Sequence, residues 1–569
     1  MTLTRSRHNG SMPLLAGATR RTWREEALMG VTLAAVSAPL AMAFAAFAGL
    51  PPTMGLYALI LPGVVFALFA RAGQLTAAPD AVLIALIAAT LTPLAAPGTD
   101  RYADLATGQA LVAAVAFLVM AATRASRVAV LLPRPVLLGL SAAIALDFLV
   151  REVAEMFGIS LGRAGAGSGG ADSGATDAAS NGFLEHARGI VARLDTANAW
   201  AVVVAAGALV ILLIGRRLAR RLPWELAVYL AGFASYRVFG LGRNGVATVG
   251  TVAGGRPPFS MPLLGAGQWL ELVPGALLLV VVALAQQQDA DPNYEQPRTR
   301  DGVVSALANA ASGLSGGFAL GPSPARRARL DELRSASQLP TLVAALLILL
   351  ALVFWSGFLG DIPTPAFAAI AAVATWPLLR LPDARALWRA SKGEFLAALL
   401  VFAATLVFGA LWGVAVAAGI GLLKLVATTA APPIDVVDVD GRPIASLRPG
   451  SPPPRLTAPG IAVVRFAAPI EASSSGALAR GIRAVLNDAA ASGDGRGIRH
   501  LVLDCEAIGA IDATGAQVLR QLLAEAAQRA VTVDYCRASA VLRVELERHG
   551  LLGGSRIFRT VREAVDTGD

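Results

Sequence analysis

Two short segments interrupt the apolar sequence with proline or glycine just before a helix can begin. The first is Ala77-Ala78-Pro79-Asp80-Ala81, which precedes the apolar run Val82–Leu91. The second is Gly313–Pro322, which is followed by Ser323. A helix that starts at such a break presents free backbone N–H groups and the positive end of its dipole, and both attract an anion. These two segments therefore favour the binding of an anion between two helix starts.

Polar side chains next to the two breaks add to this chemistry. Thr76 and Ser323 can donate hydrogen bonds to an anion, although each residue type is also an ordinary helix cap. We place Pro79, Ala81 and Ala325 in the same site because they lie at the two helix starts.

Asp80 has three interpretations. It can cap the first helix start, it can carry a proton that is coupled to anion movement, or it can pair with a cation when the site is empty. An ionised Asp80 beside a bound dianion would be repulsive, so the side chain either points away or is protonated during transport.

The segments around these breaks must span a membrane. Hydrophobic residues make up 55% of the 569 residues and charged residues 15%, whereas a soluble domain carries roughly a quarter charged residues. Apolar runs long enough to cross about 30 Å of hydrocarbon include Ala199–Gly215 and Leu339–Phe358. Phe395–Val426 is long enough for two spans separated near Gly409. Breaks inside spans are costly unless they line a cavity, and a corresponding pair indicates an inverted-repeat transporter.

Basic residues predict the topology. The net charge is +9, but the arginines cluster at the ends of apolar runs, as at Arg20, Arg21 and Arg24, so we interpret them as cytoplasmic loops rather than as a nucleic-acid surface. Both termini are then cytoplasmic, in a multi-pass protein of the cytoplasmic (inner) membrane. The first residues are basic and polar and do not resemble a cleavable signal peptide.

Asp147 lies inside an apolar run and is expected to pair with Arg151, one helical turn on.

Beyond residue 430 the sequence changes character. Strand-like and helix-like segments alternate from Ile461 to Val565, which predicts a compact α/β domain with a mostly parallel sheet. We divide the chain into a cytoplasmic segment 1–24, a transmembrane domain 25–430, a Pro-rich linker 431–456 and an α/β domain 457–569. Cys505 and Cys536 are expected to be buried free thiols.

Three motifs resemble one family. Ala48–Tyr57 reads AGLPPTMGLY, Leu307–Gly317 reads LANAASGLSGG, and the C-terminal domain resembles a STAS domain. Together they resemble the sulfate permease (SulP) family of anion transporters. The resemblance implies an α-helical polytopic membrane protein with 14 spans in two inverted repeats of seven, forming core and gate domains. It also implies a small cytoplasmic STAS domain and a homodimer.

The chain departs from the family pattern at its site. The family follows the proline of the first span with a glutamine that helps to line the anion site, but Pro39 is followed here by Leu40. The aromatic residue four positions later is retained as Phe44. Many members that couple transport to a proton or to sodium carry a glutamate in the eighth span. In this chain that position falls close to Val280, and the absence of a carboxylate there weakens the hypothesis of coupling to a cation. Arg326 aligns with a basic residue of the family and could add positive charge to the site.

The main hypothesis is secondary transport of sulfate, bicarbonate, chloride or a small carboxylate, with possible H⁺ coupling. The alternatives are a nucleobase carrier on the same fold, or a transport-dead sensor that signals through the STAS domain to a cytoplasmic protein partner. The resemblance makes Thr514 a candidate phosphoacceptor, the alternative being a plain helix cap. We find no pattern of an enzyme, a cofactor site or a metal site, and expect none.

Overall fold

The computed structural model describes residues 23–70, 77–123, 125–159, 183–219, 222–250, 252, 254–290, 299–323, 326, 330, 335, 337–448, 451–452, 455–491 and 498–567. The chain divides into two compact units, Met1–Gly421 and Leu422–Asp569. Each unit has its own hydrophobic core, and each is described by itself.

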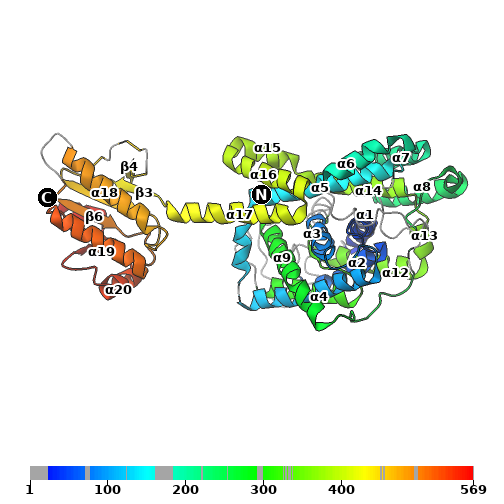
Figure 1. Ribbon diagram of the computed structural model, residues 1–569, viewed down its shortest axis with the longest axis horizontal. Helices are drawn as coiled ribbons and strands as arrows, with labels where there is room; N and C mark the ends of the chain where they lie inside the picture. The colour runs from blue at the N-terminus through cyan, green and yellow to red at the C-terminus, as the bar shows by residue number, and fades with distance from the viewer. Residues whose placement is uncertain are drawn as a thin grey trace. The chain divides into compact units, whose positions relative to one another are not determined.

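The first unit is helical (Figure 1). Its described α-helices are α1 Trp23–Phe47, α2 Pro52–Phe69, α3 Ala81–Leu91, α4 Asp100–Thr123, α5 Arg134–Met156, α6 Phe183–Ala192, α7 Ala199–Leu218, α8 Trp224–Val238, α9 Ala266–Ala290, α10 Thr299–Leu314, α12 Leu339–Phe354, α13 Ser356–Gly360, α14 Thr364–Thr375, α15 Leu381–Ala390, α16 Lys392–Phe408 and α17 Ala410–Ala430, whose residues after Gly421 belong to the second unit. Four 3-10 helices lie between them: η2 Ala125–Leu131, η3 Leu194–Thr196, η4 Leu241–Asn244 and η5 Trp376–Leu379.

Seven helical segments in the described residues are long and apolar enough to cross a membrane: α1, α2, α4, α7, α9, the stretch Thr364–Ala390 and α17. Two shorter helices, α3 and α12, are also apolar. The expected break in Phe395–Val426 is confirmed, because α16 ends at Phe408 and α17 begins at Ala410. Gly409 between them has a φ of 88°, a backbone conformation that other residues rarely adopt.

The two interrupted segments meet as a pair of very short antiparallel strands. The first, β1 (Ala77–Ala78), precedes α3, and the second, β2 (Gly321–Pro322), follows α10. Ala77 pairs with Pro322 and Ala78 with Gly321. This crossing brings the two segments together across more than two hundred residues of sequence, as the pair of interruptions predicts.

The AGLPPTMGLY motif positions α2 against α1. A Cβ atom on Gly55 would lie 2.1 Å from the carbonyl oxygen of Ala41, so any larger residue would push the two helices apart. Pro51 and Pro52 start α2, where a missing backbone N–H costs nothing. The motif therefore fixes a close approach between two helices that both contribute to the cavity described below.

The second unit contains a six-stranded sheet in the order β4-β3-β5-β6-β7-β8. Its strands are β3 Ile434–Val437, β4 Pro443–Ser446, β5 Ile461–Phe466, β6 His500–Asp504, β7 Thr532–Cys536 and β8 Ile557–Phe558. Its helices are α18 Ser475–Ala491, α19 Ala513–Gln528, α20 Ala540–Arg548 and α21 Val561–Asp566. Strands β5 to β8 are parallel, which confirms the predicted mostly parallel α/β domain.

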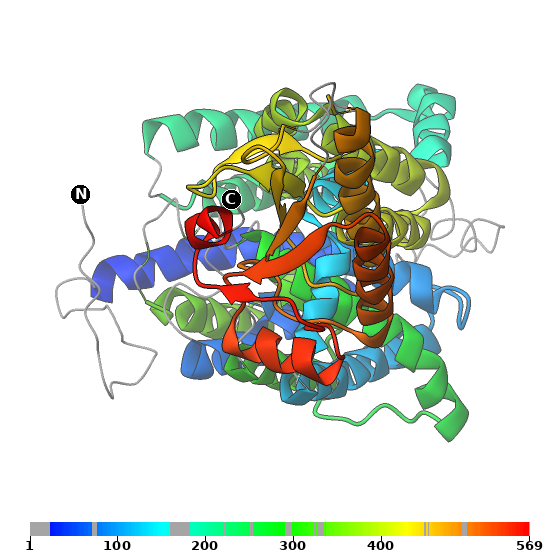
Figure 2. The same cartoon turned by 90° about the vertical axis from the view of Figure 1, so that its left-hand side faces the viewer.

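Helices α18, α19 and α20 share one core with the sheet, and α21 packs into a separate core on its other face (Figure 2). The prediction of a linker over 431–456 is wrong for part of that segment, because β3 and β4 lie within it. β4 pairs with β3, and β3 pairs with β5. Ile434 and Val436 are buried in the main core of this unit, so their apolar side chains explain why the segment joins the sheet.

Cys505 and Cys536 are free and buried, as expected. Cys505 belongs to the core shared with α18 and Cys536 to the core shared with α21. Burial raises the pKa of the Cys536 thiol to about 12 and that of Cys505 well above its ordinary value. Both side chains therefore act as small apolar residues.

Candidate functional site

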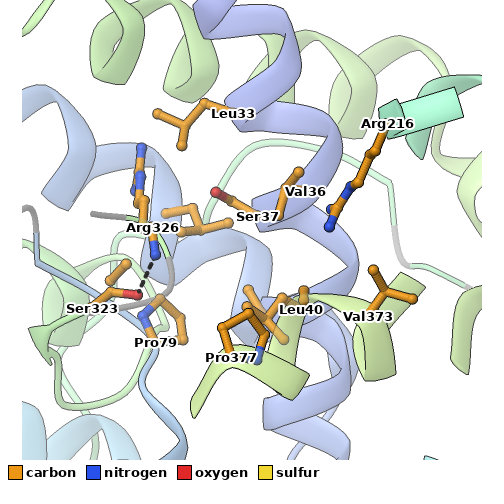
Figure 3. A pocket seen from close by; sticks show the side chains of 14 residues that line it. Leu33, Val36, Ser37, Leu40, Pro79, Arg216, Ser323, Arg326, Val373 and Pro377 are labelled. Atoms are coloured by element: carbon orange, nitrogen blue, oxygen red, sulfur yellow. Dashed lines mark hydrogen bonds between the residues drawn. The ribbon is translucent and has the colours of Figure 1, made fainter. Parts of the chain in front are cut away.

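A cavity of about 100 Å³ lies beside the crossing of β1 and β2 (Figure 3). One side is formed by α1, α2, the end of β1 and the segment after β2, and the other by α7, α14 and η5. Its lining residues are Leu33, Val36, Ser37, Leu40, Ala41, Leu59, Ala78, Pro79, Arg216, Ser323, Arg326, Val373, Ala374 and Pro377. Among the described residues the wall is therefore mainly apolar, and two arginines and two serines are its polar side chains.

The backbone before β2 is held by side chains of α10. The Asn309 amide donates to the carbonyl oxygen of Leu320 (3.1 Å) and accepts from its backbone N–H (2.8 Å). The Ser312 hydroxyl donates to the carbonyl oxygen of Phe318 at 2.7 Å. Both side chains are fully buried. Since unwound backbone cannot be solvated by lipid, Asn309 and Ser312 give the LANAASGLSGG motif a physical role: they satisfy the polar groups of the interruption.

Arg326 is the principal charged group of the cavity. The residue is 5% exposed, and within the described part of the chain neither its Nε nor its Nη1 has a hydrogen-bond partner. A buried guanidinium with unused donors is costly unless a ligand supplies acceptors, and a guanidinium matches the oxygens of an oxyanion. The guanidinium lies on the same side of the cavity as Ser37, across from Arg216 (Figure 3).

Of the residues predicted for the site, Leu40, Pro79, Ser323 and Arg326 line the cavity. The Ser323 hydroxyl accepts a hydrogen bond from the backbone N–H of Arg326 at 3.4 Å, so it caps this turn. Thr76 and Ala325 lie outside the described residues.

Asp80 does not line the cavity; it caps α3. One carboxylate oxygen accepts from the backbone N–H groups of Val82 (3.0 Å) and Leu83 (3.4 Å). The same oxygen accepts from Nε2 of Gln286 on α9 at 2.9 Å. Asp80 thus occupies the N–H groups of α3 that were expected to bind an anion. The capping interpretation is confirmed, and no ion pair joins Asp80 to Arg326 within the described residues.

We expect Asp80→Asn to retain transport within a few-fold of wild type with an unchanged pH profile, because asparagine caps helices about as well as aspartate. Asp80→Ala should instead lower stability by about 1 kcal/mol, since the cap is lost. Uptake into proteoliposomes between pH 6 and 8 and thermal unfolding in detergent measure the two effects. A pH profile that flattens in Asp80→Asn would restore the proton-coupling interpretation.

Phe44 and Ala81 are not among the lining residues, contrary to prediction. Phe44 is buried on the α5 side of α1, where its ring packs edge-on against Phe148 at a centroid distance of 5.0 Å. Ala81 is buried as the first residue of α3. Val280 is fully buried in the apolar core and also lies outside the cavity.

Two polar residues near the site were missed by sequence reasoning. Gln286 lies six residues beyond Val280, at the start of the polar triplet Gln286–Gln288. Arg216 ends an apolar run, like the arginines interpreted above as marks of cytoplasmic loops, yet it enters the cavity from the end of α7 (Figure 3). A polar side chain bordering an apolar span was the available signal in both cases.

Asp147 pairs with Arg151 as predicted, with Oδ2 at 3.9 Å from Nε. A closer partner is His186 of α6, whose Nδ1 lies 2.9 Å from Asp147 Oδ1. The Arg151 guanidinium also lies over the ring of Phe47 at 4.5 Å. This cluster lies outside the cavity next to the crossing and links α1, α5 and α6.

Thr514 is exposed on the first turn of α19. The helix cap is Asp512, which accepts from the backbone N–H of Gly515 (2.6 Å) and from that of Ala472 (2.9 Å). These two backbone hydrogen bonds lower the pKa of Asp512. The interpretation of Thr514 as the cap is therefore wrong, and its hydroxyl is left accessible. In the described residues, no group of three or more acidic, histidine or cysteine side chains could hold a metal ion.

The family model described as the sulfate permease family matches residues 25–401, and that of the STAS domain matches residues 453–564. A protein named "Probable sulfate transporter MT1781" from Mycobacterium tuberculosis is 30% identical over 565 residues, which cover 96% of this chain and 95% of the relative. "Sulfate transporter 4.1, chloroplastic" from Arabidopsis thaliana is 25% identical over 95% of this chain and 79% of the relative.

Solved structures share the fold. The murine Solute Carrier 26 family member A9 anion transporter in its inward-facing state superimposes with a TM-score of 0.78 at 18% identity, over 99% of this chain and 96% of the other. The transmembrane domain of a cyanobacterial bicarbonate transporter gives 0.56 at 17% identity, over 70% of this chain and 99% of the other.

The helical unit, the crossing of two interrupted segments and the appended α/β domain define a polytopic membrane transporter fold with a STAS domain. The chain belongs to the sulfate permease family.

Proposed function

We propose that this protein is a secondary transporter that moves a small anion across the cytoplasmic membrane by alternating access. The observation that carries the proposal is the buried Arg326 guanidinium, whose Nε and Nη1 have no partner in the described residues, beside the crossing of β1 and β2. The candidate substrates are sulfate, bicarbonate, chloride and a small dicarboxylate. The names of the relatives support an anion in general.

Alternating access would involve the two sides of the cavity as separate domains. We assign α1, α2, α3 and the crossing to a core domain, and α7, α14 and η5 to a gate domain. The antiparallel pairing of Ala77–Ala78 with Gly321–Pro322 is what two inverted repeats would produce, and we include two repeats of seven spans each in the proposal. Movement of the core against the gate would expose the anion to one side of the membrane and then the other. Both termini would be cytoplasmic, and the protein a homodimer.

Within this mechanism the anion is held mainly by Arg326 and by the start of the second half-helix. Ser37 and Ser323 line the same cavity and supply hydroxyl groups. Asp80 already occupies two N–H groups of α3, so the first half-helix contributes less than its sequence suggests. Leu40 leaves an apolar wall where the family has an amide. Thr514, exposed on the STAS domain, remains a candidate phosphoacceptor for docking a cytoplasmic partner.

The alternatives are less well supported. A nucleobase carrier would need acidic residues on the eighth and tenth spans, but Glu271 of α9 is exposed and does not line the cavity, and Gln286 of the same helix is bound to Asp80. A transport-dead sensor would have no reason to keep a buried arginine whose Nε and Nη1 have no partner in the described residues.

Flux into proteoliposomes tests the function. We expect uptake of at least one of sulfate, bicarbonate, chloride or succinate by the full-length protein, and no uptake of uracil. Imposed pH and sodium gradients would show whether a cation is coupled. If no anion enters above the level of empty liposomes, the transporter proposal is wrong, and uptake of uracil alone would support the nucleobase carrier.

A further inference from the structure

The two arginines of the cavity differ in whether an acidic residue neutralises their charge, and this difference bears on the charge of the substrate. Among the described lining residues, Arg216 and Arg326 are the charged side chains. They come from opposite sides: Arg326 from the segment after β2, and Arg216 from the last turn of α7. Figure 3 shows the two guanidinium groups on either side of α1 residues Leu33 to Leu40.

The charge of Arg216 is compensated. Its Nη2 and Nε donate to the same carboxylate oxygen of Glu225, at 2.6 and 3.2 Å. The Glu225 side chain is 0% exposed, whereas that of Arg216 is 25% exposed. Glu225 lies in the first turn of α8, a position that favours an ionised carboxylate. A buried carboxylate is stable only while it is paired, so drawing Arg216 away toward a bound anion would be strongly unfavourable.

The charge of Arg326 is not compensated in this way. No ion pair to Arg326 occurs among the described residues, and Asp80, which follows β1, is directed to the N–H groups of α3 and to Gln286. The cavity therefore presents one positive side chain in excess.

A single excess positive charge favours singly charged anions. The cost of removing an anion from water grows with the square of its charge, but its attraction to one cation grows only in proportion to that charge. A dianion such as sulfate would need a second free cation to recover its hydration energy.

We propose that Glu225, by neutralising Arg216, makes the site selective for singly charged over doubly charged anions. This inference rests on the proposed transport function and adds the residue that sets the charge of its substrate. Wild-type protein prefers chloride or bicarbonate to sulfate. Removal of the Glu225 charge frees Arg216 as a second cation and admits the dianion.

The test compares sulfate with chloride uptake by full-length protein in proteoliposomes. Glu225→Gln keeps a carbonyl oxygen for Arg216 but removes the charge, and it should raise the sulfate-to-chloride ratio about tenfold or more. The double variant Arg216→Gln/Glu225→Gln has the same net charge as wild type and should return the ratio toward the wild-type value. Comparing ratios between variants cancels the difference in shape between the two anions.

Asp361→Asn is the matched control, because Asp361 pairs with Arg237 at 2.5 Å and does not line the cavity. Its ratio should equal that of wild type. The proposal is overturned if wild type carries sulfate at least as well as chloride, or if Glu225→Gln carries chloride with an unchanged ratio. If Glu225→Gln does not fold, the wild-type ratio still decides: a preference for chloride supports the proposal, and sulfate uptake at least equal to that of chloride overturns it. Failure of wild type to carry any anion would instead remove the proposed function itself.

Discussion

Replacing Arg326 with glutamine is expected to lower anion uptake by about 100-fold, the effect of removing a buried charged contact worth roughly 2–5 kcal/mol. The guanidinium is the cavity's uncompensated charge, and its Nε and Nη1 have no partner in the described residues. Its loss should weaken anion binding while it relieves the protein of a buried cation. Uptake of the best substrate into proteoliposomes measures the effect, and thermal unfolding in detergent should show no loss of stability.

Arg326→Lys separates charge from shape in this experiment. Lysine keeps the charge but not the planar fork that matches an oxyanion. Anion uptake by Arg326→Lys should therefore fall between that of wild type and that of Arg326→Gln. Arg237→Gln serves as control, since Arg237 is exposed and outside the cavity. Near wild-type uptake by Arg326→Gln would show that the anion is held elsewhere.

Replacing Asn309 with leucine should prevent most of the protein from folding. Leucine fills a similar volume, but it leaves both the N–H and the carbonyl of Leu320 without their partner. Each such group costs several kcal/mol inside a membrane. We expect a large loss of monodisperse protein on size-exclusion chromatography, and a Tm at least about 5 °C lower in what remains.

A graded control accompanies this variant. Ser312→Ala removes a single hydrogen bond, that to the carbonyl oxygen of Phe318, and should lower Tm less than Asn309→Leu. Equal Tm values for Asn309→Leu and wild type would mean that water or another side chain satisfies Leu320.

The sequence allowed the interrupted segments, the break at Gly409 and the parallel α/β domain to be predicted. Each of these has a local signal: Pro or Gly within an apolar run, or strand and helix patterns in alternation. The crossing of β1 with β2 followed from treating two such breaks as a pair. Leu40, Pro79, Ser323 and Arg326, which were predicted for the site from these breaks and from the family resemblance, line one cavity beside the crossing.

The remaining errors share a physical cause, which is that they depend on partners distant in the sequence. Asp80 binds Gln286, 206 residues away, and nothing near Asp80 indicates that contact. Phe44 turns to Phe148 because α5 packs there. Strands β3 and β4 were hidden in a Pro-rich segment because β3 joins the sheet by pairing with β5, which lies beyond that segment, and β4 pairs in turn with β3. The role of Arg216 depends on a turn that brings Glu225 beside it.

The crossing at Ala77–Ala78 and Gly321–Pro322 is made by main-chain atoms, and the clamp on the second segment is a side-chain amide on backbone groups. The framework of the site is thus separate from the side chains that decide what it holds. If the proposed function holds, a change of cargo would need changes only at positions such as Leu40, Arg216 or Glu225, without rebuilding the fold. Variation in substrate is therefore an expected outcome of evolution on this scaffold, and protein engineers can use the same positions.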